Sequence, residues 1–191
     1  MIINSFKFKK SVQALNYFAK KEGGKINLMK AVKLVWLSDR VHLRIYGRSI
    51  TNDQYLAMKH GLVPSGTKDI ISKSQFFERE IIDYVNQFIS DVEDYNFTSL
   101  SEIDKSVFSK TDLKILEQIY SYYGDKDQYQ LSEYSHHFPE WLRFESNLKD
   151  GLGKRFNVVE NDFFENGDIV DEPFSQDEEL LTLSKEHYCF G

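Results

Sequence analysis

The sequence contains a single cysteine, Cys189, among its 191 residues, and this scarcity limits what the chain can build. One thiol cannot form an intrachain disulfide framework or a cysteine-rich zinc site. No stretch approaches the roughly 20 consecutive apolar residues that a membrane-spanning helix needs. The opening MIINSFKFKK also lacks the apolar run and cleavage site of a secretory signal. We therefore expect a soluble, cytoplasmic protein that does not bind a membrane.

Familiar catalytic and ligand-binding motifs are missing as well. The five histidines are scattered, without an HExxH pattern or a cysteine–histidine pairing, so we predict no metal site. His136 and His137 are adjacent, and on a helix they point about 100° apart, so we expect His136 to be a hydrogen-bonded structural residue. The stretches YGRS, KHGLVPSG and YYGDKD fit neither a P-loop nor a dinucleotide fingerprint, and no cofactor is predicted.

Enough apolar residues are present to build a core. Hydrophobic residues make up 41% of the sequence and aromatic residues 15%, which argues against global disorder. A chain of this length usually forms one domain, or one domain with an appendage.

Charge is distributed very unevenly along the chain. Residues 1–48 hold 11 Lys and Arg against 2 acids, a balance of +9, whereas residues 160–191 hold one lysine against ten acids, a balance of −9. The basic first quarter could attract phosphate, but the protein is acidic overall at −6 and shows no recognition-helix pair. We therefore do not expect direct DNA binding.

Helical periodicity is clearest in the first quarter. Phe8, Val12, Leu15 and Ala19 form one stripe of a helix that should end at KKEGG. Asn27 is a suitable N-cap for a second helix that runs to Gly47. Apolar residues occupy two neighbouring faces of this second helix, so we predict that it is buried on more than one side and is the central helix of the fold.

Asp39 and His42 lie one turn apart on this central helix. A buried Asp–His pair could serve as a catalytic base, but no nucleophile motif accompanies it. The alternative is that both residues are polar anchors that hold neighbouring segments, and we favour that interpretation.

The rest of the chain predicts shorter elements. Residues 49–66 read as extended chain or loop, with Ser65 opening a short helix, and residues 76–92 fit either a helix or a hairpin. Ser109 and Asp112 resemble a capping box, Ser132 is a candidate cap for a helix through EYSHHF, and QDEELLTLSKEHY fits an amphipathic helix. The predicted fold is mainly α (α+β): a compact helical domain around a central buried helix, with a small β element.

Four blocks follow one another in a familiar order: KLVWLSDRVHLRIYGR, YLAMKHGLVPSG, FSKTDLKILEQIYSYYG and LSEYSHHFPEW. Together they resemble the Panacea domain, also called the SocA-like antitoxin domain, over about residues 10–145. Leu62 departs from the pattern, since the family commonly has proline there in a Gly-Pro-Val turn.

The resemblance implies a function that the composition of the chain does not indicate. Panacea-like proteins are antitoxins of bacterial or phage toxin–antitoxin pairs, often on mobile elements, and they neutralise a cognate toxin encoded by a neighbouring gene through direct binding. One family member is instead a proteolytic adaptor that delivers its toxin to an AAA+ protease, which is the alternative function here. Neither role makes this chain an enzyme, and we predict no catalytic residue. Asp39, His42, Gly47, His136 and Trp141 become structural anchors in this picture.

We predict a division into a Panacea-like domain, residues 1–159, and an acidic, partly helical segment, residues 160–191. The acidic segment interleaves carboxylates with apolar side chains and could cover a basic site on the toxin. The alternative is that it packs on the chain's own basic first quarter. The residues predicted to contact the partner are Arg40, Arg48, Phe163, Phe164, Asp171, Glu172 and Phe174.

Overall fold

The structure, a computed structural model, describes residues 6–170 and 172–190. The helices are α1 (Phe8–Lys21), α2 (Leu28–Tyr46), α3 (Ser65–Ile71), α4 (Arg79–Phe88), α5 (Lys110–Tyr123), α6 (Gln128–Tyr134), α7 (Pro139–Leu142), α8 (Glu145–Lys149) and α9 (Glu178–Phe190). The 3-10 helices are η1 (Lys105–Val107), η2 (Ser135–His137) and η3 (Glu160–Phe164). The strands are β1 (Lys25–Asn27), β2 (Tyr55–Met58), β3 (Gly61–Pro64), β4 (Asn96–Thr98) and β5 (Arg155–Asn157). The mainly α fold class is confirmed.

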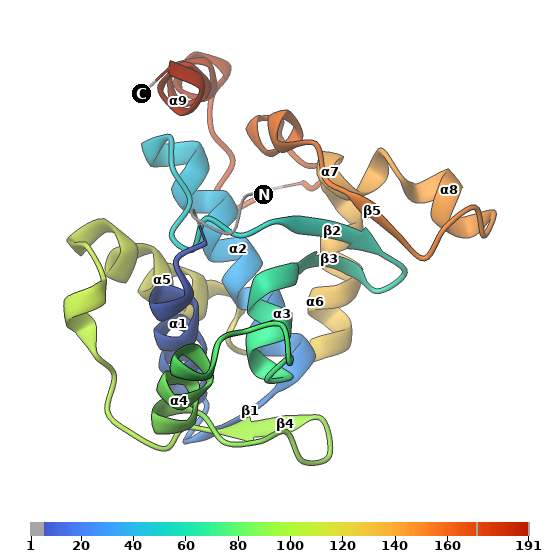
Figure 1. Ribbon diagram of the computed structural model, residues 1–191. Coiled ribbons are helices and arrows are strands. Elements are labelled where there is room, and N and C mark those ends of the chain that lie inside the picture. The colour runs from blue at the N-terminus through green and yellow to red at the C-terminus, as the bar shows by residue number, and fades with distance from the viewer. Residues whose placement is uncertain (1–5, 171, 191) are drawn as a thin grey trace.

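Helix α2 is the central helix, as predicted. Every residue from Lys30 to Arg44 is buried, and the helix contacts α1, α5, α6, α9 and β3 around its circumference (Figure 1). The predicted ends are confirmed. The side chain of Asn27 accepts hydrogen bonds from the backbone N–H groups of Met29 and Lys30 at 2.9 and 3.3 Å, and Gly47 ends the helix at φ 65°.

Two small antiparallel sheets flank this core. Strand β1 pairs with β4 at one end of α1, and β2 pairs with both β3 and β5. The stretch 49–66, expected as extended chain or loop, therefore contains a regular hairpin with Lys59 and His60 in its turn. Leu62, the residue that departs from the family pattern, is fully buried in β3 opposite Ala57, so the hairpin accommodates it as a core residue.

The ambiguous segment 76–92 forms helix α4, and Ile89 after it forms an isolated antiparallel bridge with Ser99. The capping box of Ser109 and Asp112 at the start of α5 is confirmed. The predicted cap at Ser132 is wrong, because Asp127 and Gln130 form a capping box that starts the helix earlier. Ser132 lies inside α6, where its hydroxyl donates to the carbonyl of His60 at 2.9 Å.

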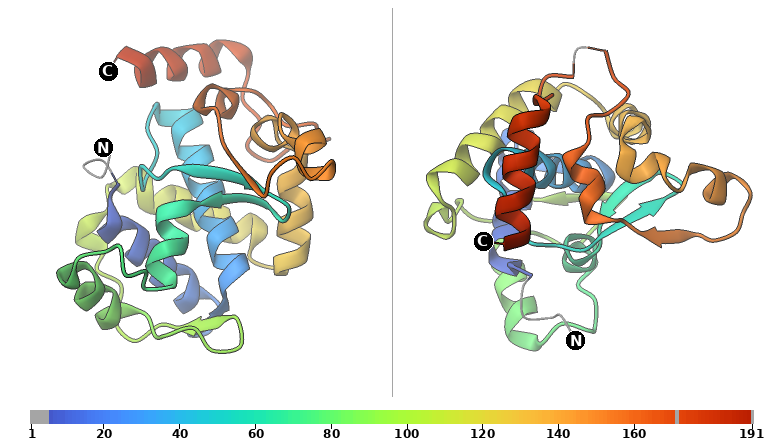
Figure 2. Two further views of the ribbon diagram at one scale, coloured as in Figure 1. Left: turned by 45° about the vertical axis from the view of Figure 1, so that its right-hand side comes forward. Right: turned by 90° about the horizontal axis from the view of Figure 1, so that it is seen from above.

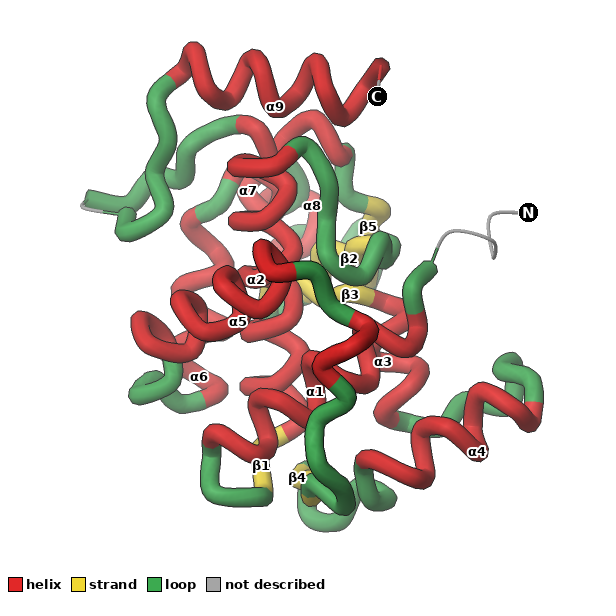
Figure 3. Tube along the Cα trace, turned by 90° about the vertical axis from the view of Figure 1, so that its left-hand side faces the viewer, coloured by secondary structure: helices red, strands yellow, loops and turns green. Residues whose placement is uncertain are grey.

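The C-terminal segment, which we define as residues 160–170 and 172–190, returns across the molecule. It begins with η3, passes over the C-terminal half of α2 and ends in α9, the predicted amphipathic helix (Figure 2). Helix α9 lies at the periphery and contacts α2 and η3 (Figure 3). The predicted boundary at residue 159 falls between β5 and η3, and the division into two domains stays a prediction.

Candidate partner-binding site

The cationic face of α2 is covered by the chain's own C-terminal segment. The Arg40 guanidinium donates to Glu140 Oε1 at 2.8 Å, to Glu172 Oε1 at 3.2 Å and to the backbone carbonyl of Glu165 at 2.8 Å. It also lies 4.3 Å from the ring centroid of Phe138. Arg40 is 1% exposed, so this predicted partner-binding residue is not accessible in the structure.

Arg44, one turn further along α2, depends on the C-terminal segment even more. Its Nη1 donates to the backbone carbonyls of Phe163 at 2.8 Å and Glu165 at 2.7 Å, and its Nη2 donates to the side chain of Asn166. Burial, together with the positive charge of Arg40, lowers the pKa of Arg44 to about 9. Of the two alternatives for the acidic segment, the structure shows the one in which it packs on the basic first quarter.

The predicted aromatic contacts of the C-terminal segment also point inward. Phe163 packs edge-to-face on Tyr55, with 4.9 Å between ring centroids, and Phe174 packs against Tyr122 at 5.1 Å. Phe164, also buried, faces Tyr188 at 5.8 Å. Glu172 is buried beside Arg40, and Asp171 lies outside the described residues. In this conformation the described residues of this segment that are predicted to contact the partner therefore pack inside the fold.

A second buried cluster joins α1, α2 and α5 around Asp112. Its carboxylate accepts from Arg48 Nη2 at 2.9 Å, faces His42 Nε2 at 3.1 Å and pairs with Lys10. Burial alone would raise the pKa of Asp112, but hydrogen bonds from His42, Lys10 and the backbone of Ser109 outweigh it and hold the pKa well below its usual value. Arg48 keeps 38% of its side chain exposed, unlike the other described residues predicted to bind the partner.

Asp39 and His42 do not form a pair with each other. Asp39 accepts hydrogen bonds from the backbone N–H groups of Ile50 and Thr51 at 2.7 and 2.9 Å, and from the Tyr55 hydroxyl at 2.8 Å. Burial raises the pKa of Asp39, although these hydrogen bonds oppose the rise. His42 Nδ1 lies 2.7 Å from the carbonyl of Arg48. Both side chains thus hold the chain that leaves α2, as the structural-anchor interpretation requires.

The other predicted anchors also lie at packed junctions. Gly47 sits against the ring of His187 in α9, where an added Cβ would come within 2.5 Å of His187 Cδ2. The rings of His136 and Trp141 stack with 4.0 Å between centroids, and Trp141 Nε1 donates to the carbonyl of Met58 at 2.8 Å. Burial lowers the pKa of His136.

Sequence reasoning missed Arg44, Glu140 and Asp112 as members of these clusters. Arg44 follows Arg40 by four residues and therefore shares its helix face, which was a usable signal for a paired cationic site. Glu140 and Asp112 gave no comparable signal, because their partners on α1, on α2 and at Arg48 lie 64 to 102 residues away in the sequence.

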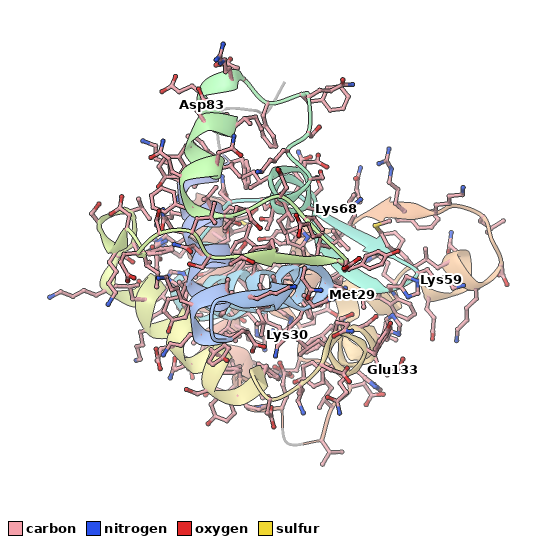
Figure 4. The ribbon with its side chains drawn as sticks, turned by 90° about the horizontal axis from the view of Figure 1, so that it is seen from below. Met29, Lys30, Lys59, Lys68, Asp83 and Glu133 are labelled. Atoms are coloured by element: carbon pink, nitrogen blue, oxygen red, sulfur yellow. The ribbon has the colours of Figure 1, made fainter. Side chains whose placement is uncertain are left out.

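The lysines of the basic first quarter are partly neutralised by acids, two of them from distant segments and one, Glu22, from the same quarter. Lys20 pairs with Glu102 at 2.6 Å, Lys21 with Glu117 at 2.9 Å and Lys30 with Glu22 at 2.6 Å. Figure 4 shows the end of the molecule away from α9, where Lys30, Lys59 and Lys68 are labelled together with the acids Asp83 of α4 and Glu133 of α6. This end presents both signs of charge.

Helix α9 presents an outer face that differs from the buried clusters, and we define it as Glu179, Leu180, Leu183, Glu186 and Phe190. Its apolar members are 49% (Leu180), 55% (Leu183) and 90% (Phe190) exposed. The helix buries Leu181 and Ser184 on another side. Among the described residues, this face combines exposed large apolar side chains with carboxylates on one regular helix.

The described part of the chain contains neither a cluster of metal-ligating side chains nor a membrane-spanning helix. No group of three or more His, Cys, Asp or Glu side chains there could hold a metal ion. Nor does any helix among those residues have the length and apolarity needed to cross a bilayer.

These features define the class of protein: a mainly α domain whose central helix carries a buried, paired set of charged side chains. The family model described as "Antitoxin SocA-like, Panacea domain" matches residues 32–142, from α2 to α7 and more than half of the chain, so the protein belongs to this family. The family indicates an antitoxin-type role, a toxin as partner and a non-catalytic protein. No curated protein and no solved structure matches the chain significantly.

Proposed function

We propose that this protein neutralises a cognate toxin in the cytoplasm by binding it directly, as a stoichiometric partner and without catalysis. The observation that carries the proposal is the family match over the whole central part of the fold, residues 32–142. The geometry agrees with it, because Asp39, His42 and Asp112 direct their polar atoms to structural partners within the chain.

Most of the residues predicted to contact the partner are not accessible to a toxin in this structure. Arg40, Phe163, Phe164, Glu172 and Phe174 are buried, so a toxin could reach them only if the C-terminal segment moved away. Arg48 is partly exposed and stays a proposed contact. A test that deletes residues 160–191 would remove every hydrogen-bond acceptor that the structure gives to Arg44, so loss of function in that variant could reflect unfolding.

The experiment is co-expression of the intact protein with the product of the gene next to its own. We expect the neighbour to arrest growth by itself, and we expect this protein to restore growth and to co-purify with it at a fixed ratio. The amount of toxin in the rescued cells should stay unchanged. Rescue accompanied by rapid loss of the toxin, dependent on an AAA+ protease, would contradict this mechanism and favour the proteolytic adaptor. A harmless neighbour that never co-purifies would contradict the proposal itself.

A further inference from the structure

The outer face of α9 occupies one continuous arc of the helix. Successive residues of an α-helix are rotated by about 100°, which places Glu179, Leu180, Leu183, Glu186 and Phe190 within about 120° of one another. Leu180, Leu183 and Phe190 follow at spacings of three and seven residues, a pattern typical of helices that lie in a groove of another protein. The chain leaves these three side chains exposed.

Helix α9 is held firmly by its other side. Leu181 and Ser184 are buried, the Tyr188 hydroxyl donates to Glu160, and the Tyr188 ring faces Phe164. His187 lies within the arc of the outer face, between Leu183 and Leu180, and its close contact with Gly47 fixes that edge of α9 against the end of α2. A helix that is already ordered loses little conformational entropy on binding, which favours its use as a binding surface.

Charge determines what kind of surface α9 fits. Residues 177–190 carry four acids and one lysine, and Glu179 and Glu186 lie on the outer face itself. Both carboxylates are exposed, and the described residues offer neither of them an ion-pair partner. A complementary surface is therefore apolar along its floor and basic along its rim.

We propose that the outer face of α9 is the surface that binds the toxin, and that it lies in an apolar groove of the toxin rimmed by lysine or arginine side chains. This inference rests on the proposed function, since it names the contact surface for the same partner. Charge disfavours the other occupants: a second copy would bring like carboxylates together, and an anionic membrane would repel them. With 13 residues at about 1.5 Å each, α9 is about 20 Å long, enough for a helix-in-groove interface.

The experiment measures binding of the purified neighbouring-gene product to full-length variants by calorimetry. In the apolar variant, Leu183→Ser is combined with Phe190→Ser, and in the charge variant Glu179→Lys is combined with Glu186→Lys. Leu152→Ser and Glu80→Lys, which alter exposed side chains elsewhere in the chain, are the matched controls. We expect at least a 30-fold loss of affinity in the apolar variant, because it removes two of the three exposed apolar side chains of the outer face and a few such anchors supply most of the binding energy of an interface. The charge variant should bind more weakly and lose much of its salt dependence.

The outcomes separate the inference from the proposed function. Because the altered side chains are exposed, all variants should keep the far-UV circular dichroism and melting temperature of the wild type, which confirms that binding is compared between folded proteins. If both α9 variants bind the toxin with the same affinity as the wild type, the inference is wrong and the proposed function is still supported. A second result would also overturn the inference: the wild type self-associates, and the apolar variant loses this self-association but still binds the toxin. The outer face of α9 would then bind a second copy of this chain. Failure of the wild type to bind at all would refute the proposed function first.

Discussion

Replacing Gly47 by alanine should loosen the contact between α2 and α9, and the structure allows the effect to be divided into two parts. Gly47 has φ 65°, a left-handed conformation that alanine adopts at a cost of about 1–2 kcal/mol. The new Cβ would also lie 2.5 Å from Cδ2 and 2.9 Å from Cβ of His187. Rotating the His187 side chain cannot move its Cβ, so the backbone of α9 must shift.

Gly151 offers a matched control for the backbone part. It has φ 70°, and an alanine Cβ there would meet no atom within 4 Å. We expect Gly151→Ala to destabilise the protein by about 1 kcal/mol and Gly47→Ala by about 3 kcal/mol, since overpacking adds about 1–3 kcal/mol. The difference measures the energy of forcing α9 away from α2.

The assay is urea denaturation of the single and double variants, with His187→Gly as the second partner of a double-mutant cycle. In the His187→Gly background, Gly47→Ala should cost only about 1 kcal/mol, because the clash is gone. The helix-propensity cost of the new glycine appears in both legs of the cycle and cancels. The packing explanation would be refuted if Gly47→Ala and Gly151→Ala lowered the free energy of unfolding equally. It would also be refuted if Gly47→Ala cost as much in the His187→Gly background as in the wild type.

Three further predictions concern buried side chains. Burial lowers the pKa of Lys33 to about 7 from 10.5. Between about pH 7 and 10 the unfolded chain therefore binds one proton more than the folded protein, so the free energy of unfolding of the wild type should rise with pH. Denaturation curves measured across that range should show no such rise for Lys33→Met. Asp112→Asn should cost about 2 kcal/mol at pH 7 by thermal unfolding. Because the folded pKa of Asp112 is lowered, that cost should shrink as the pH falls below about 4, and a constant cost would contradict the cluster. Phe174→Ala should cost about 3 kcal/mol in urea, while Val170→Ala, at a position 90% exposed, should change stability by less than about 0.5 kcal/mol.

The parts of the fold that depend on near neighbours in the chain were predictable. Asn27 caps α2 through backbone groups two and three residues away, and Ser109 caps α5 in the same way. The burial of α2 on several sides followed from apolar residues on two of its faces. Where two local signals competed, as at Asp127 and Ser132, the complete capping box determined the start of the helix.

Charge pairing over long distances was not predictable in the same way. The −9 balance of residues 160–191 indicated an interacting segment, but it left open whether the partner was the toxin or the chain itself. Arg40 finds Glu140 and Glu172 at separations of 100 and 132 residues, and no local spacing encodes such a choice. The same packing buries Phe163 and Phe174, which the sequence could not distinguish from the exposed Leu183 and Phe190.

By itself, the sequence determined the helices α1, α2 and α5 with the caps of α2 and α5, the central position of α2 and membership of the Panacea family, because periodicity, capping and motif order are local properties of the chain. Only the tertiary structure decided which acidic and aromatic side chains of residues 160–170 and 172–190 serve the fold and which face outward on α9. That decision depends on how the C-terminal segment packs over Arg40 and Arg44, and packing between distant segments is a property of the whole folded chain.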